Sequence, residues 1–143
     1  MGTVRHILQK KGHNAYSVDP SATVYYALEY MVEKNVGALL VMDKERFAGI
    51  FTERDYARKV ILKGKASKET LVREIMSEHP ATVTPDDTVE GCMKLMTQKY
   101  IRHLPVLEGD KLVGLVSIGD IVKYIIEEQK FIIDNLEHYI TGH

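Results

Sequence analysis

The sequence predicts a mixed α/β protein, which some definitions class as α+β, made of two copies of one β-α-β-β-α unit. The first observation behind this prediction is an internal repeat, because residues 17–55 align with residues 82–120 without a gap. The second is that both copies change from a helical hydrophobic period to short apolar strands at the same point. Such a duplication predicts an internally symmetric pair, since a solenoid needs at least three repeats.

The repeat holds at the level of individual residues. The identical positions are Val18 and Val83, Pro20 and Pro85, Thr23 and Thr88, Val24 and Val89, Met31 and Met96, Lys34 and Lys99, Leu39 and Leu104, Val41 and Val106, Gly49 and Gly114, and Asp55 and Asp120. The segment before each copy also recurs, since Val4–Leu8 resembles Val72–Met76. We place the first unit with an N-terminal helix at residues 1–66, the second unit at 67–125, and a C-terminal helical extension at 126–143.

Helices are expected at equivalent places in the two copies. Asp19-Pro20 and Thr84-Pro85 are predicted helix starts, because a capping side chain precedes proline at the first helical position. The last helix is expected from about Ile118 to Tyr139. Its apolar stripe is too long for a solvated tail and predicts a partner surface. The stripe consists of Ile121, Ile125, Ile132, Leu136 and Ile140.

Each copy also contains two short strands separated by a polar turn. Residues 38–42 and 103–107 form the first strand, and residues 47–52 and 112–117 form the second. A short connection between apolar runs predicts a β-hairpin.

Composition and charge exclude several classes of protein. Apolar residues make up 45% of the chain and charged residues 27%, the balance of a soluble globular protein. The 19 Lys and Arg against 20 Asp and Glu leave no basic footprint for nucleic acid. The single cysteine, Cys92, fits a reducing compartment. No signal peptide or membrane-spanning run is apparent, so we expect a cytoplasmic protein that binds neither nucleic acid nor membrane.

The end of the second strand carries the most informative motif. Both copies contain Gly-x-x-[Ser/Thr]-x-x-Asp, at Gly49–Asp55 and Gly114–Asp120. The glycine is expected to let a ligand approach the backbone closely. The hydroxyl lies where a helix begins, and a helix N-terminus offers N–H groups to a phosphate. The ionised Asp accepts hydrogen bonds, for example from a ribose diol.

A purely structural explanation of this motif competes with the ligand site. Thr52 with Asp55, and Ser117 with Asp120, approximate a capping box that stabilises a helix and does nothing more. A cap explains the hydroxyl and tolerates the Asp, but it does not require the glycine. The recurrence of the whole motif therefore favours a ligand.

These motifs resemble those of cystathionine β-synthase (CBS) domains. The resemblance rests on the repeated motif, on the strand Arg102–Val106 and on the Thr-Pro-x-x-Thr-Val entry at Thr84–Val89, and it covers about residues 3 to 125. It implies a stand-alone bacterial CBS pair, or Bateman module, with two CBS units related by a pseudo-two-fold axis. The family implies adenine ligands in the clefts between the units: AMP, ADP, ATP or NAD, with S-adenosylmethionine less favoured.

The resemblance also implies which residues meet in each cleft. One cleft would contain Ser117 and Asp120 with Asn14, Ala15, Tyr16, Val36, Gly37 and Ala38. The other would contain Thr52 and Asp55 with Pro80, Ala81, Thr82, Ile101, Arg102 and His103. Ile50 and Leu115 belong to the expected ligand contacts as well. In each cleft the Asp would hold the ribose, and the Ser or Thr hydroxyl would hold either the ribose or a phosphate. Backbone groups and apolar side chains would sandwich the adenine.

The two copies differ where charge matters. Arg102 and His103 stand where the first copy has Gly37 and Ala38. Because guanidinium suits phosphate, we expect unequal clefts with Arg54, Arg102 and His103 as the main phosphate contacts. Arg58 fits a solvated helix face equally well.

No catalytic constellation is present in the sequence. Cys92 falls on an apolar helix face, and the six histidines lack metal-ligand spacing. We therefore predict a non-catalytic regulatory module without a catalytic cofactor, an energy or redox sensor that forms a homodimer through its C-terminal stripe and first helix. A regulated partner protein is part of this prediction. One alternative is an interaction module with vestigial clefts; the other is a nucleotide hydrolase with Asp55 or Asp120 as the base.

Overall fold

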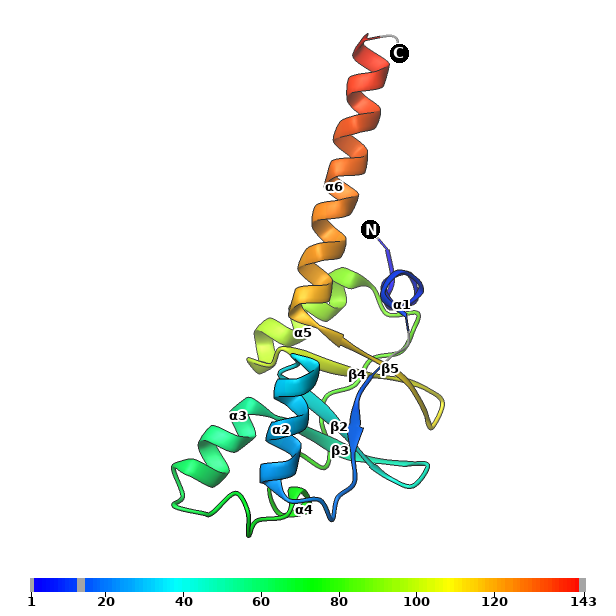
Figure 1. Ribbon diagram of the computed structural model, residues 1–143. Coiled ribbons are helices and arrows are strands. Elements are labelled where there is room, and N and C mark those ends of the chain that lie inside the picture. The colour runs from blue at the N-terminus through cyan, green and yellow to red at the C-terminus, as the bar shows by residue number, and fades with distance from the viewer. Residues whose placement is uncertain (1, 13–14, 142–143) are drawn as a thin grey trace.

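The computed structural model describes residues 2–12 and 15–141, and its elements repeat as the sequence predicts. In chain order they are α1 (Val4–Lys11), β1 (Ser17–Val18), α2 (Val24–Lys34), β2 (Ala38–Asp43), β3 (Arg46–Thr52), α3 (Glu53–Tyr56), the π-helical turn η1 (Ala57–Ile61), α4 (Val72–Ile75), α5 (Val89–Lys99), β4 (His103–Glu108), β5 (Lys111–Ser117) and α6 (Ile118–Thr141). The predicted mixed α/β fold is confirmed (Figure 1).

The two hairpins have the same register. β2 pairs antiparallel with β3, and β4 pairs antiparallel with β5, with a register shift after Val41 and after Val106. β1 adds a parallel strand beside β2, whereas the equivalent segment of the second copy contributes one bridge, from Val83 to Val106. The predicted strands are confirmed to within a residue at their ends.

The predicted helix starts at Pro20 and Pro85 are wrong, because both prolines lie in turns. Asp19 accepts a hydrogen bond from the Ser21 amide at 2.8 Å, which closes a local turn. The helices begin several residues later, with Thr23 and Thr88 as N-caps whose hydroxyls accept from the amides three residues further on, those of Tyr26 and Gly91. The local signal identified a chain reversal correctly but placed the helix too early.

These turns hold the helix that precedes the other copy. The first two amides of α1, on Val4 and Arg5, donate to the carbonyls of Asp87 and Pro85 at 2.9 and 2.8 Å. The first two amides of α4, on Val72 and Arg73, donate to the carbonyls of Ala22 and Pro20 at 2.8 and 2.9 Å. The amides of a helix's first turn have no acceptor within the helix. The turn of each copy therefore supplies carbonyl acceptors to the helix that precedes the other copy. We call these two helices, α1 and α4, the lead-in helices.

Each hydrophobic core contains the lead-in helix of one copy packed against the strands and helix of the other copy. Val4, Ile7 and Leu8 of α1 pack with the second copy, in the core around β4, β5, α5 and Ile121. Val72 and Ile75 of α4 pack with the first copy, around β2, β3 and α2. Each core therefore contains chain from both sides of residue 66, and the unit boundaries at 66 and 125 stay predictions.

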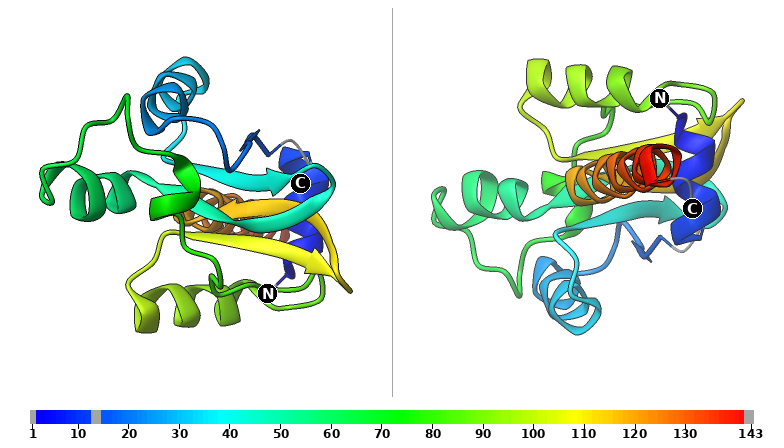
Figure 2. Two further views of the ribbon diagram at one scale, coloured as in Figure 1. Left: turned by 90° about the horizontal axis from the view of Figure 1, so that it is seen from below. Right: turned by 90° about the horizontal axis from the view of Figure 1, so that it is seen from above.

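The layers are arranged symmetrically around the strands. Figure 2 shows α2 and α5 on opposite outer sides, with the two hairpins between them. α6 begins beside the second hairpin and projects away from the rest of the chain, as Figure 1 shows. In the described part of the chain, no helix is both long enough and apolar enough to cross a membrane.

The two repeated glycines, Gly49 and Gly114, lie in close contact with other parts of the chain. A Cβ at Gly49 would lie 2.3 Å from the carbonyl oxygen of Ser77, and one at Gly114 would lie 2.8 Å from Cδ2 of Leu8. Ser77 follows α4 and Leu8 lies within α1, and each of these helices packs on the hairpin that contains the glycine. The expectation that these glycines open the backbone to a ligand is therefore wrong, because the chain itself makes the close approach.

Replacing the two glycines by alanine should have unequal effects. Gly49→Ala should lower the free energy of unfolding by about 1–3 kcal/mol, since its methyl group meets backbone that cannot rotate away. Gly114→Ala should cost less, because its methyl group meets the end of the Leu8 side chain, which can move; the roughly 0.5–1 kcal/mol returned by losing a strand glycine is common to both variants. Urea unfolding of both variants measures the difference, and equal losses would contradict this explanation.

Candidate functional site

A cavity of about 980 Å³ lies between the two copies beside the first Asp of the repeated motif. The first copy contributes the start of α3, η1 and Gly37, and the second copy contributes residues 77–81, the end of α5 and the start of β4. In Figure 1 the α3 segment and the C-terminal end of α5 lie on the same side of the molecule. The volume is within the usual range of ligand pockets, about 300–1,000 Å³.

Asp55 is held firmly at the base of this cavity. Its Oδ2 accepts hydrogen bonds from the Thr52 amide at 3.0 Å and the Thr52 hydroxyl at 3.1 Å, and its own amide donates to that hydroxyl. Its Oδ1 faces the Ser77 hydroxyl at 3.4 Å and the Lys59 ammonium at 3.1 Å. The capping box predicted as the structural explanation is therefore present. The carboxylate also lines a cavity, so a cap alone does not describe its position.

Basic side chains from both copies line the rest of the cavity. The Arg54 guanidinium donates to the backbone carbonyl of Tyr100 and so bridges the copies. Arg58 and Lys59 come from the π-helical turn, a feature often found at functional sites. Arg102 and the half-buried His103 come from the start of β4. The lining is thus cationic, with Glu53 and Asp55 as its acidic members.

Apolar side chains also line the cavity. Ile50 and Met96 are almost fully buried, and Pro80, Ala81 and Ile101 are half-buried. A cavity lined by both apolar and cationic side chains suits a ligand that combines a flat apolar ring with an anionic group.

A smaller cavity, about 260 Å³, lies beside the second Asp of the repeated motif, between α1 and the start of α6. Asp120 accepts from the Ser117 amide at 2.9 Å, and its amide donates to the Ser117 hydroxyl at 3.1 Å, so the capping geometry is repeated. α1 forms one wall through Ile7, Lys10 and Lys11. Burial alone would raise the pKa of Asp120, but hydrogen bonds from Lys11 and Ser117 hold that pKa below its ordinary value.

The structure brings together nearly all of the residues predicted for the Asp55 cleft. Those that line the cavity are Ile50, Thr52, Arg54, Asp55, Pro80, Ala81, Ile101, Arg102 and His103. Thr82 is exposed outside it. Gly37 was expected in the other cleft, but it lies here because its carbonyl accepts from the Glu53 amide at 3.2 Å.

The grouping predicted for the Asp120 cleft does not form in the small cavity, of which only Asp120 is a member. Tyr16 packs edge-on against Tyr30 instead, and Ala38 is buried in β2. Ala15, Val36, Leu115 and Ser117 are half-buried. Asn14 lies outside the described residues.

Several residues of the Asp55 cavity were not predicted from the sequence. The spacing of Lys59 from Asp55, one helical turn, is a local signal that could have found it. Ser77, Met96, Thr97 and Tyr100 carry no such signal, because they reach the cavity through long-range packing. Lys11 also had no local signal for its contact with Asp120.

Nothing in the described ranges, 2–12 and 15–141, groups three or more His, Cys, Asp or Glu side chains as a metal site would. Cys92 is buried in the second core, as predicted, and burial together with the charge of Asp87 raises the pKa of its thiol to about 11. A thiol with so high a pKa is a poor nucleophile at neutral pH.

The chain therefore consists of two α/β units that exchange their lead-in helices, with a cavity of mixed apolar and cationic lining between them. The chain belongs to the CBS domain family. The family model matches residues 4–62 and again residues 72–127, so each match begins at a lead-in helix. The resemblance drawn from the repeated motif is confirmed.

Known proteins agree with this assignment. The chain is 40% identical to the mitochondrial CBS domain-containing protein CBSX3 of Arabidopsis thaliana, over 98% of this chain and 72% of that one. It superposes with a TM-score of 0.85 and 50% identity on a putative signal-transduction protein with CBS domains from Burkholderia ambifaria, covering 89% and 96% of the two chains. A structure of CBSX2 in complex with AMP matches with a TM-score of 0.73 and 28% identity, over 90% and 99%. These relatives place the chain among CBS-pair proteins of regulatory type.

His103 makes stability depend on pH. Burial is the main cause that lowers its pKa, with Lys11 and Arg102 adding to it and Asp120 opposing it. The unfolded chain, with a histidine pKa of about 6.5, therefore takes up a proton first as pH falls. The free energy of unfolding should decrease from about pH 6.5 towards the lower pKa of the folded state. His103→Asn should flatten this decrease in urea unfolding at stepped pH, and an unchanged slope would contradict it.

Proposed function

We propose that this chain is a non-catalytic regulatory module that binds an adenine nucleotide in the Asp55 cavity. The observation that carries the proposal is the mixed lining of that cavity, which combines Asp55, basic side chains from both copies and apolar side chains. The AMP bound to the similar CBSX2 supports the class of ligand. AMP, ADP, ATP and NAD are the proposed ligands, with S-adenosylmethionine less favoured, and the module acts as an energy or redox sensor.

The proposed pose follows the chemistry of the lining. The ribose diol donates hydrogen bonds to Asp55, because an ionised carboxylate can accept hydrogen bonds but cannot donate them. The adenine lies against Ile50, Met96 and Ile101. The phosphates face Arg102 and His103, and Arg54 can exchange the neutral carbonyl of Tyr100 for an anion, since charge-assisted hydrogen bonds are the stronger ones.

Sensing follows from the position of the cavity between the copies. A ligand that contacts both copies stabilises the arrangement in which both contacts are made, and only by its difference in affinity for the two arrangements. A partner protein that recognises that arrangement would be regulated. The rival proposal is an interaction module with vestigial clefts, and it differs by predicting no nucleotide binding.

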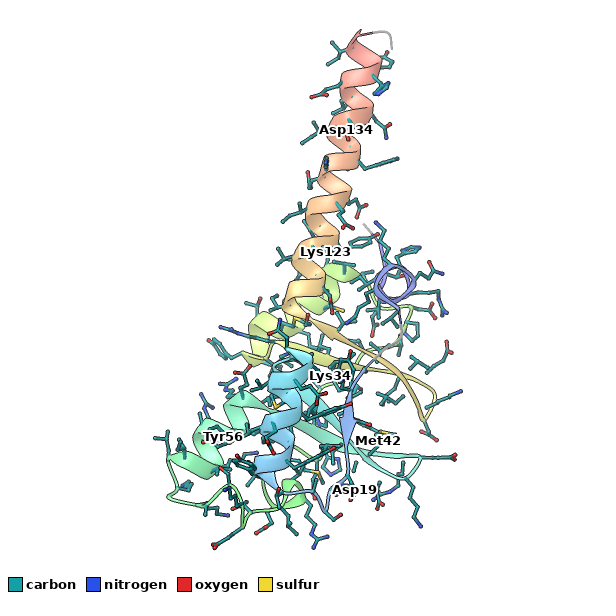
Figure 3. The ribbon with its side chains drawn as sticks, viewed as in Figure 1. Asp19, Lys34, Met42, Tyr56, Lys123 and Asp134 are labelled. Atoms are coloured by element: carbon teal, nitrogen blue, oxygen red, sulfur yellow. The ribbon has the colours of Figure 1, made fainter. Side chains whose placement is uncertain are left out.

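A homodimer remains part of the proposal, with α6 as its contact. Figure 3 shows the part of α6 around Asp134 standing clear of the other elements. Phe131, Ile132 and Leu136 on this part are 66%, 47% and 55% exposed. α1 is less suited to the contact than expected, because its apolar residues are buried within the chain. The proposed location is the cytoplasm, although the similar CBSX3 is named as mitochondrial.

Ligand binding to the Asp55 cavity can be measured by thermal shift and calorimetry with AMP, ATP, NAD and S-adenosylmethionine. A ligand at ~100 times its dissociation constant adds about 2.7 kcal/mol to the free energy of unfolding. Asp55→Asn keeps a capping oxygen but removes the charge, and it should weaken AMP binding about 10- to 100-fold. The matched variant Asp120→Asn should leave this binding unchanged. Equal losses in both variants would contradict unequal clefts, and no shift with any ligand would favour the vestigial module.

The phosphate part of the pose has its own test in Arg102. Arg102→Gln should weaken AMP about tenfold or more, because a charge-assisted hydrogen bond to the phosphate is lost. Adenosine, which lacks the phosphate, should bind the variant as it binds the wild type. If both ligands lose affinity equally, Arg102 supports the cavity wall and does not contact phosphate.

A further inference from the structure

Lys11, the last residue of α1, forms an ion pair with Asp120, the motif carboxylate of the second copy. The Lys11 ammonium donates to Oδ2 of Asp120 at 2.7 Å and to the Leu115 carbonyl at 2.9 Å. The two charged side chains are 30% and 22% exposed, so water screens this pair less than it screens a surface ion pair. Asp120, the counterpart of the proposed ribose acceptor, is therefore already engaged by the chain itself.

This contact arises from a difference in length between the two lead-in helices. α1 continues to Lys11, and that continuation carries the ammonium to Asp120. α4 ends at Ile75, and Met76 is already extended. Ser77 then exchanges backbone hydrogen bonds with Ile50 at 3.0 and 2.9 Å, so this lead-in leaves the Asp55 cavity open.

Asp55 also has a lysine partner, but the arrangement differs. Lys59 lies one turn later on the same helical segment, is 44% exposed and lines the large cavity. Its ammonium also donates to the Ile75 carbonyl at 3.1 Å, which holds the positive charge at the wall of the large cavity, beside an incoming phosphate. Lys11 reaches Asp120 from another element, and Ile7 and Lys10 of that element line the same 260 Å³ cavity. Lys11 is thus the part of the α1 wall that covers the carboxylate.

We propose that Lys11 determines which cleft accepts the nucleotide, by occupying Asp120 and so restricting binding to the Asp55 cavity. This inference rests on the proposed function, since it assumes that an ionised Asp at this position takes up the ribose diol. The repeated motif is complete in both copies and so cannot by itself distinguish the two clefts. In this proposal α1 makes the distinction, through Lys11. The chain then binds one nucleotide at low concentration although it contains two copies of the motif.

The test is calorimetric titration of the whole chain with AMP and, separately, with ATP. Lys11→Met keeps the aliphatic stem that packs along α1 but removes the ammonium. The wild type should bind one nucleotide per chain. Lys11→Met should bind a second one, with an affinity at that site raised at least about tenfold, which corresponds to about 1.4 kcal/mol.

Three further variants make the result specific. Lys10→Met changes a lysine of the same helix and the same cavity, whose partner is the exposed Glu127 at 3.4 Å, and it should not create a site. Lys11→Met combined with Asp120→Asn should lose the added site again. Lys11→Met combined with Asp55→Asn should keep the added site alone. Thermal unfolding of each variant establishes that it is folded.

The outcomes separate this inference from the proposed function. If the wild type binds one nucleotide through Asp55 and Lys11→Met also binds only one, the inference is wrong and the proposed function stands. Two equal sites in the wild type would have the same meaning. If the wild type binds nothing but Lys11→Met binds at Asp120, the inference stands and the Asp55 proposal is wrong. If neither chain binds, both are wrong.

Discussion

The fold depends on an exchange of backbone hydrogen bonds between the two copies. α1 donates its first amides to the turn at Pro85, and α4 donates its first amides to the turn at Pro20. Both helices are far shorter than the ~12–15 residues at which an isolated helix becomes even marginally stable, so packing and these carbonyls must stabilise them. Each hairpin in turn buries its apolar face partly under the lead-in helix it receives. Neither copy is complete without the other, and the cavities between the copies follow from that.

The parts of the structure that local patterns predicted are those held by local interactions. Both hairpins, the two helix starts after Thr52 and Ser117 and the long α6 were all predictable from hydrophobic period and turn residues. The turns at Pro20 and Pro85 were taken for helix starts because a cap followed by proline also fits a turn, and only the incoming lead-in helix decides between them. Gly49 and Gly114 were likewise expected to let a ligand approach, because a strand glycine fits close approach by a ligand and by another part of the chain equally well. The close approach that excludes a side chain comes from residues distant in sequence, Ser77 and Leu8.

The candidate site was predictable to the extent that it repeats. Thr52 and Asp55 follow from the motif, and the aligned difference at Arg102 and His103 marks the cationic part of the cavity. The end of α5 was not predictable, since Tyr100 enters the site through its left-handed backbone and its carbonyl. Unequal clefts were predicted from charge alone and stay a prediction; the different lengths of α1 and α4, which lie outside the aligned motif, could not be read from the repeat.

The contact between the copies at Arg54 gives the proposed sensing a physical basis. Arg54 belongs to the first copy and donates to the Tyr100 carbonyl of the second, so one side chain links the proposed phosphate position to the relative placement of the copies. An anion that competes for this guanidinium replaces a contact between copies with a contact to ligand. The free energy of that replacement differs between arrangements that keep Tyr100 near Arg54 and arrangements that do not. A difference of this kind is the only means by which a ligand can shift a conformational equilibrium.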